Sequence, residues 1–169
     1  MTVRYKGHVS PMPAFLAFMA PPLTANRGES GKMETIRETL DSSLESVDKA
    51  EELAVREAGK LGLDEDSASQ FGMAVRECMV NAVVHGNRYS EHKKVHFSVQ
   101  RNDQKIAVTI GDEGQGFDYT SLPDPLAPEN LLRQSGRGLL LSRAFSDEFD
   151  LHPRAGGGTE VLLAKHRQA

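Results

Sequence analysis

The stretch ECMVNAVVHGN, residues 77–87, does most to decide how this chain folds. In the helix that contains this stretch, apolar residues occupy most of the circumference, a pattern typical of a buried helix. Glu77, Asn81 and His85 nevertheless recur at every fourth position and therefore form one polar stripe. A carboxylate and an amide on a buried helix are costly unless polar groups face them. Either the stripe faces a water-filled cleft that takes a ligand, or it forms internal hydrogen bonds.

The pattern of apolar residues on both sides of this stretch predicts an order of strands and helices. Gly62 and Gly86 are expected to end two long helices. We expect a strand over 33–41, a helix over 44–61 opened by a capping box at Ser42–Glu45, a second helix over 64–85, a hairpin around 95–99 and 106–110, a short helix over 139–145, and a closing hairpin around 149–151 and 161–163. This order, β-α-α-β-β-α-β-β, predicts an α+β fold, a two-layer sandwich with helices on one face of a mainly antiparallel sheet.

The composition is that of a soluble chain with one domain. Hydrophobic residues make up 38% of its 169 residues and charged residues 26%, which suits a domain with its own core. The net charge of -4 argues against direct binding to nucleic acid or to an anionic membrane. Cys78 is the one cysteine, so we expect no internal disulfide, a reducing cytoplasm and a thiol that only packs in the core. No apolar run reaches the roughly 20 residues that span a bilayer.

The start of the chain follows a different pattern from the rest. Residues 1–32 are rich in proline and lack periodicity, so we expect a flexible leader, followed by one domain over 33–169. A signal peptide is the alternative for residues 11–23. Prolines leave only residues 14–20 as an uninterrupted apolar run, however, and no clean cleavage site follows. Met33 begins the periodic pattern and is a candidate start of translation.

Three further segments carry residues suited to ligand binding. Residues 112–116, DEGQG, follow a predicted strand, where glycines let the backbone approach a ligand while the Asp112 carboxylate accepts a hydrogen bond. Residues 136–138, GRG, open the short helix, whose free amides and dipole favour a phosphate. Residues 156–159, GGGT, precede the last strand. Each segment taken alone also fits a tight turn.

Taken together and in order, the four segments resemble the GHKL (Bergerat-fold) ATPases, which include gyrase, MutL and histidine kinases. Residues 77–87 match the N box of that superfamily, 112–116 its first Gly box, 136–138 the second and 157–159 the third. The resemblance covers about 34–166. The short chain and the run GRGLLL at 136–141 look most like the bacterial anti-sigma-factor serine kinases, which phosphorylate a small antagonist protein.

That resemblance implies that the chain binds ATP with Mg²⁺. Asn81 would hold the Mg²⁺ that bridges the phosphates, because an amide oxygen on a rigid helix suits a hard cation. Glu77, one turn earlier, would be the general base, and Asp112 would accept a hydrogen bond from the adenine amine. The other residues expected to bind ATP are Gly114, Gly116 and Thr159 on the adenine side and Arg133, Gly136, Arg137 and Gly138 around the phosphates. Arg133 is the preferred partner of the γ-phosphate because it precedes the glycine pair in the lid, residues 117–135.

The same resemblance implies an ATP-dependent serine/threonine protein kinase and anti-sigma-type regulator. It would phosphorylate a small anti-anti-sigma-like protein in a partner switch, with a sigma factor as a second partner and a homodimer as one oligomeric option. The alternative is a nucleotide-dependent binding module that sequesters a sigma factor or another regulator without significant turnover. A histidine kinase would need an upstream helix with a phosphoacceptor histidine, a pattern that residues 1–32 do not show.

Three charged residues near these segments have no role implied by the resemblance. His85 would lie beside the phosphates or would form a hydrogen bond at the helix end; both interpretations remain open. Lys93 and Lys94 are expected to lie on a solvated strand edge.

Overall fold

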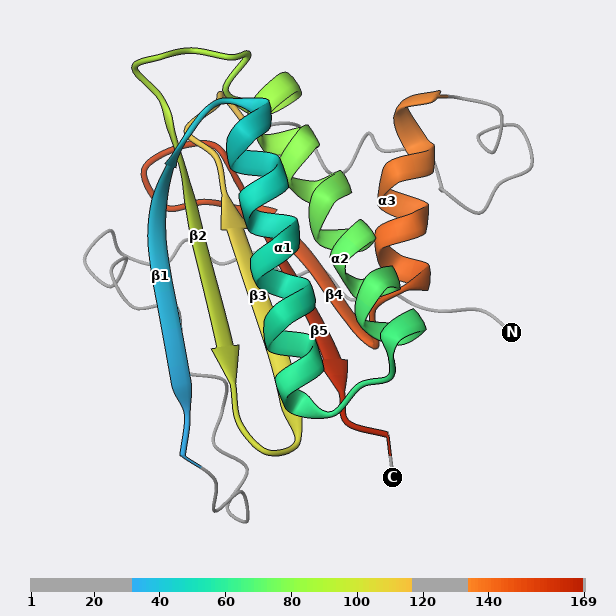
Figure 1. Ribbon diagram of the computed structural model, residues 1–169. Helices are drawn as coiled ribbons and strands as arrows, with labels where there is room; N and C mark the ends of the chain where they lie inside the picture. Colours follow the sequence, from blue (N-terminus) through green and yellow to red (C-terminus); the bar gives the residue numbers. More distant parts are fainter. Residues whose placement is uncertain (1–31, 117–133, 169) are drawn as a thin grey trace, which may run out of the picture.

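The computed structural model describes residues 32–116 and 134–168, which form two layers (Figure 1). In chain order the elements are β1 (Glu34–Asp41), α1 (Leu44–Leu61), α2 (Glu65–Val80), η1 (Asn81–Gly86), β2 (Lys94–Arg101), β3 (Lys105–Gly111), α3 (Gln134–Ala144), β4 (Glu148–Pro153) and β5 (Thr159–His166). The predicted leader and nearly all of the predicted lid lie outside the described residues. The division of the chain at residue 33 therefore stays a prediction.

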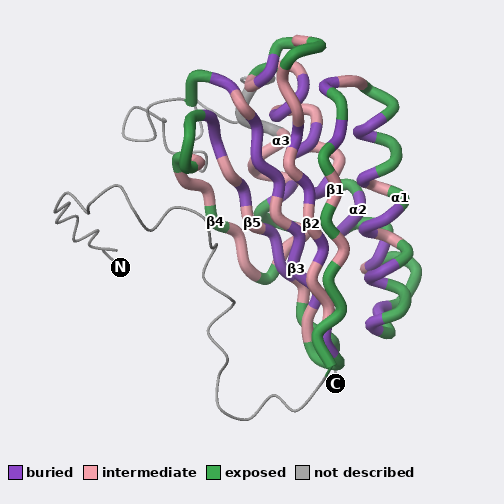
Figure 2. Tube along the Cα trace, turned by 90° about the vertical axis from the view of Figure 1, so that its left-hand side faces the viewer, coloured by how far each residue is buried: buried purple, intermediate pink, exposed green. Residues whose placement is uncertain are grey.

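The described strands form one sheet in the order β1-β2-β3-β5-β4. Every neighbouring pair is antiparallel, and β5 lies between β3 and the edge strand β4. The helices α1, α2 and α3 all lie in front of the sheet in Figure 1, and the turned view in Figure 2 shows α1 and α2 beside it as a second layer. The predicted α+β sandwich with helices on one face is confirmed.

The core lies between the two layers. Along β2, buried apolar residues alternate with partly exposed ones, as the period of a half-buried strand requires, whereas β3, in the middle of the sheet, is buried at nearly every position. The inward side chains are almost completely buried, among them Val95, Phe97 and Val99 on β2, Ile106, Val108 and Ile110 on β3, and Phe71, Val75 and Met79 on α2. Burial of each large apolar side chain contributes roughly 1.5–3 kcal/mol, so this layer contact holds the sheet and α2 together.

The start of α1 differs from the predicted capping box. Ser43 is the N-cap residue, and its hydroxyl accepts a hydrogen bond from the Ser46 amide at 3.3 Å. Ser42 instead donates a hydrogen bond to the carbonyl of Lys93 at 2.6 Å. The predicted box from Ser42 to Glu45 was wrong, because a tertiary partner takes the Ser42 hydroxyl.

Two other helix boundaries also differ from the prediction. The helix expected over 64–85 changes at Asn81 into the π-helix η1, whose wider turn joins the Asn87 amide to the Ala82 carbonyl at 2.8 Å. α3 begins at Gln134, so residues 136–138 lie inside its first turns instead of before them. No helix in the described ranges is long and apolar enough to cross a membrane.

Candidate functional site

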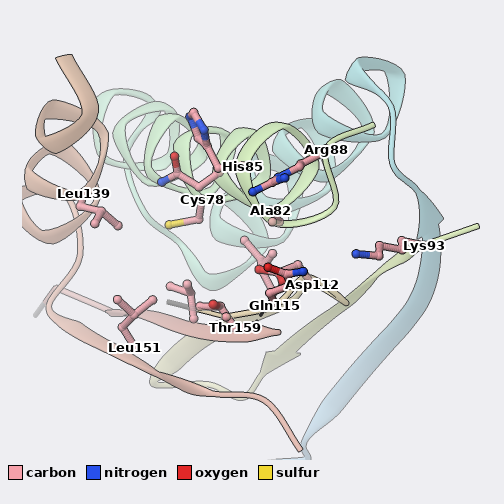
Figure 3. A pocket seen from close by; sticks show the side chains of 15 residues that line it. Cys78, Ala82, His85, Arg88, Lys93, Asp112, Gln115, Leu139, Leu151 and Thr159 are labelled. Atoms are coloured by element: carbon pink, nitrogen blue, oxygen red, sulfur yellow. Dashed lines mark hydrogen bonds between the residues drawn. The ribbon is translucent and has the colours of Figure 1, made fainter. Parts of the chain in front are cut away.

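A cavity of about 460 Å³ lies between η1 and the sheet, where β3 ends and β5 begins (Figure 3). Its polar lining residues are Asn81, His85, Arg88, Lys93, Asp112, Gln115 and Thr159, and its apolar lining includes Ala82, Ile110, Leu139, Leu151 and Val161. A cavity of this size with apolar walls and a few placed polar groups is typical of a site for a small molecule. In Figure 3, Asp112 and Thr159 on the sheet side face Ala82 and Cys78 on the helix side.

Asp112 follows β3 directly and is only 6% exposed. Its Oδ1 atom accepts hydrogen bonds from the amides of Gly114 at 2.8 Å and Thr159 at 3.2 Å. Burial raises the pKa of this carboxyl, although the two amides and the nearby cations of Arg154 and Lys93 oppose the shift. Oδ2 receives no hydrogen bond from the described residues. Asp112 therefore offers the cavity one carboxylate oxygen as an acceptor.

Two glycines let the chain close around Asp112. A Cβ atom on Gly86, the last residue of η1, would lie 2.5 Å from the Asp112 Cγ atom. A Cβ atom on Gly158 would lie 2.1 Å from the Asp112 carbonyl oxygen, and Gly158 has a φ of +94°. A side chain at either position would push the segments apart. The sequence predicts Gly86 as the end of a helix, but the close approach to Asp112 is what requires a glycine there.

The predicted polar stripe divides where α2 meets η1. Asn81 lines the cavity, and its side-chain amide has no hydrogen-bond partner among the described residues. Glu77, one turn earlier, is not among the lining residues. It faces α3, where a Cβ atom on Gly138 would lie 2.6 Å from the Glu77 Oε2 atom. The structure therefore places the predicted metal ligand in the cavity and the predicted general base at the contact between α2 and α3.

The other predicted ATP-binding residues fall into three groups. Gly116 and Thr159 line the cavity, as expected for the adenine side. Gly114 supports the site indirectly, through its amide hydrogen bond to Asp112. The remaining four residues are those expected around the phosphates. Gly136, Arg137 and Gly138 lie within α3, and Arg133 lies outside the described residues. The choice between the two arginines for the γ-phosphate stays a prediction.

Several cavity residues were not found from the sequence. Lys93 directly precedes β2 and is partly exposed, but it also lines the cavity, which its predicted place on a solvated strand edge did not include. Lys94 forms an ion pair with Asp41. Arg88 also lines the cavity, from a turn in which Arg88 and Tyr89 both have left-handed φ values of 53° and 55°. No periodic pattern predicts two consecutive left-handed residues of this kind, since only a few per cent of non-glycine residues adopt a positive φ.

His85 and Cys78 line the same cavity. His85 is exposed there and makes no hydrogen bond with the described residues, so the interpretation as a helix-end hydrogen bond finds no support in that part of the chain. Cys78 is 1% exposed, and its thiol lies 3.4 Å from the Ser142 hydroxyl of α3. Burial raises the pKa of Cys78 to about 12, which keeps the thiol protonated and unreactive. The predicted packing role is confirmed, but the side chain also forms part of the cavity wall.

Comparison with known proteins finds a matching family and several similar sequences. The family model described as the histidine kinase-like ATPase domain matches residues 40–165. The anti-sigma F factor of Clostridium beijerinckii is 28% identical over 109 residues, which cover 59% of this chain and 71% of that protein. The anti-sigma F factor of Bacillus subtilis is 32% identical over 105 residues, or 60% of this chain and 70% of that protein. The serine-protein kinase RsbW of Staphylococcus epidermidis is 30% identical over 104 residues, or 57% of this chain and 65% of that protein.

Proposed function

The chain belongs to the histidine kinase-like ATPase family, and on that premise we propose that it is an ATP-dependent serine/threonine protein kinase and an anti-sigma-type regulator. In this proposal it phosphorylates a small antagonist protein in the cytoplasm and so switches partners. The observation that carries the proposal is the cavity, which is lined by the Asp112 acceptor and by the Asn81 amide, a group with no hydrogen-bond partner among the described residues. The names of the relatives, anti-sigma F factor and serine-protein kinase, support the same reaction and the same class of partner.

The base of ATP would bind at the sheet side of the cavity. Oδ2 of Asp112 would accept a hydrogen bond from the exocyclic amine, because Oδ1 is already occupied by two amides. Thr159 would add a hydroxyl on the same side, and Gly116 would let the base lie close to the backbone. The apolar walls would cover the faces of the base.

The phosphates would bind toward Asn81, and the donors present there fit Mg²⁺. An amide oxygen is a suitable ligand for this hard cation, which usually takes one or two protein ligands and completes its octahedron with phosphates and water. Among the described residues, no group of three or more histidine, cysteine or acidic side chains could hold a metal ion, so Asn81 would hold the ion together with the nucleotide itself. The bound ion would neutralise charge that develops on the transferred phosphate.

Glu77 would accept the proton of the attacking hydroxyl. Its carboxylate lies one turn from Asn81 and against Gly138 of α3, so the hydroxyl would approach between α2 and α3. Because Glu77 does not line the cavity itself, a binding module that holds a regulator without turnover stays the second candidate function.

The partner would be a small single-domain protein that presents a serine or threonine hydroxyl at a helix N-terminus. A phosphate is favourable there because it meets the helix dipole. Phosphorylation would add about two negative charges to an interface with a chain of net charge -4. Repulsion should then release the product and couple the chemistry to the exchange of partners.

Phosphotransfer to the partner tests the proposal. Affinity capture with and without ATP, followed by mass spectrometry, would provide the partner. Wild type should then transfer phosphate from Mg²⁺-ATP, and Glu77→Gln should bind ATP normally but transfer about 10²-fold more slowly. Glu52→Gln, an exposed change on α1, is the control and should transfer at the wild-type rate.

The complex with ADP and the unphosphorylated partner should weaken at least about tenfold when the partner is phosphorylated. Equal affinity for both forms would exclude the switch. A chain beginning at Met33 should keep both activities if the domain is correctly divided at that residue. No phosphorylated partner after prolonged incubation would favour the binding module instead.

A further inference from the structure

Asn87 is a buried polar side chain beside the cavity whose amide nitrogen and oxygen both form hydrogen bonds. It follows η1 directly, is 1% exposed and contacts three separate segments. Its Nδ2 atom donates to the Ser42 hydroxyl at 2.9 Å and to the carbonyl of Lys94 at 2.9 Å. Its Oδ1 atom accepts from the amide of Glu113 at 2.8 Å. One side chain thus joins the end of β1, the start of β2 and the loop that carries Asp112.

These contacts require an amide at this position. The Ser42 hydroxyl already donates its hydrogen to the Lys93 carbonyl, so toward Asn87 it can only accept. The Lys94 carbonyl is also only an acceptor, whereas the Glu113 amide is only a donor. Two donors and one acceptor on a short planar group match these partners, and no other side chain of the same size supplies them.

The bond to Glu113 bears directly on Asp112. On one side, the Asp112 amide donates to the Thr159 carbonyl at 2.9 Å, which joins the loop to β5. On the other side, Asn87 holds the Glu113 amide, which belongs to the peptide group that follows Asp112. The backbone on both sides of the Asp112 side chain is therefore fixed, and with it the direction of the carboxylate.

The Glu113 side chain does not duplicate this contact. It accepts from the Lys94 amide at 3.1 Å and pairs with His96 at 2.7 Å, both on β2. The Glu113 carboxylate is half-exposed, and those bonds leave the Glu113 backbone amide to Asn87 alone. Loss of Asn87 would leave a backbone donor without a partner beside Asp112, which favours a shift of the loop.

We propose that Asn87 is a positioning residue that aims the Asp112 carboxylate at the adenine amine and so sets the preference of the site for adenine nucleotides. This inference rests on the proposed ATP site. The sequence contains Asn87 in the segment that matches the N box, but its role depends on three segments that only the fold brings together.

The test compares ATP with purine riboside triphosphate, which lacks the 6-amino group but is otherwise nearly the same shape. The ratio of the two dissociation constants, measured by calorimetry, reports the amine contact by itself. Asn87→Ala should reduce the preference of the wild type for ATP at least about fivefold, the effect of one lost hydrogen bond, and leave the affinity for the analogue nearly unchanged.

Asn102→Ala is the matched control. Asn102 is also buried and accepts hydrogen bonds from backbone amides, those of Gln104 and Lys105, but at the opposite end of the β2–β3 hairpin. It should lower the thermal midpoint and keep the nucleotide preference within about twofold, since distant sites act independently. An Asn87→Ala preference equal to the wild-type value would overturn the inference.

Two further variants keep the test decisive. Asn87→Asp retains an acceptor for the Glu113 amide, so it should keep more of the ATP preference than Asn87→Ala; an equal loss would overturn the role of that bond. If Asn87→Ala does not fold, Asn87→Ser replaces it with the same expected loss. A wild-type protein with no preference for ATP over the analogue would instead refute the proposed adenine contact, which separates that failure from the failure of the role of Asn87.

Discussion

Asp112→Asn should change the nucleotide preference of the cavity without unfolding the chain. The amides of Gly114 and Thr159 both donate to Oδ1, so an introduced amide must place its oxygen there. Its NH₂ group then occupies the position of Oδ2 and faces the ligand. An acceptor that suits the adenine amine becomes a donor that suits the carbonyl of inosine triphosphate.

The magnitude follows from the contact that is lost. A hydrogen bond to a charged group contributes roughly 1.5–3 kcal/mol, and each 1.4 kcal/mol is tenfold in affinity, so ATP should bind about 10- to 150-fold more weakly. Inosine triphosphate, which the wild type should bind poorly, should gain affinity. The order of preference for the two nucleotides should therefore reverse.

The stability of the variant provides a second measurement. Because burial raises the pKa of Asp112 in the folded chain, its contribution to stability is greatest below its ordinary value of 3.8 and is lost as the pH rises through the raised value. Asp112→Asn has no carboxyl group to ionise at this position, so its stability does not fall in this way as the pH rises. At pH 7 the variant should have a free energy of unfolding no lower than that of the wild type, and its relative advantage should shrink as the pH falls toward 4.

Calorimetric titration with both nucleotides and urea unfolding would measure these effects. Asp147→Asn is the matched control, because Asp147 also accepts a backbone amide, that of His166 at 2.8 Å, but lies outside the cavity lining. It should leave both affinities unchanged. A folded Asp112→Asn protein with wild-type affinity for ATP would refute the proposed contact between Asp112 and the adenine amine.

Three further predictions concern the packing around the site and the fold. Gly158→Ala should destabilise the chain and abolish ATP binding, whereas Gly156→Ala, with a similar φ of +89° but no atom within 4 Å of its Cβ, should only destabilise it; equal binding by both would contradict the close approach to Asp112. Cys78 should react with iodoacetamide at least about 100-fold more slowly in the folded chain than in urea, because a buried thiol whose pKa is raised to about 12 forms little thiolate, and rapid labelling of the native chain would show that the thiol is accessible. Burial raises the pKa of Glu57, but hydrogen bonds from Lys60, Arg101 and Arg56 outweigh it and lower the pKa, so the stabilisation should be present above the ordinary value of 4.5 and be lost as the pH falls below it. Glu57→Gln should therefore be less stable than the wild type at pH 7 but not at low pH in urea unfolding, and a deficit independent of pH would exclude this ion cluster as its cause.

The element order and the location of the site residues within it could be predicted from the sequence. Alternating apolar residues in 95–99 and 106–110 and the helical period of 44–61 report burial directly, because a local period of two or 3.6 sets which side of an element faces the core. The segments 77–87, 112–116 and 157–159 converge in the structure, and Asn81, Asp112 and Thr159 line one cavity. The ordered set of segments, through its resemblance to a known family, therefore found these three cavity residues but not Arg88 or Lys93.

The contacts of these residues, in contrast, depend on the tertiary structure. Glu77 and Asn81 lie on one stripe by sequence, yet one faces Gly138 of α3 and the other faces the cavity. The contacts of Asn87 and the place of Lys93 in the cavity wall depend on β1, β2 and the loop after β3, which lie far apart in the chain. A local period records only whether a residue is buried. The hydrogen bonds and close approaches that aim a buried polar group arise between distant segments, so they exist only once the sheet and helices have packed.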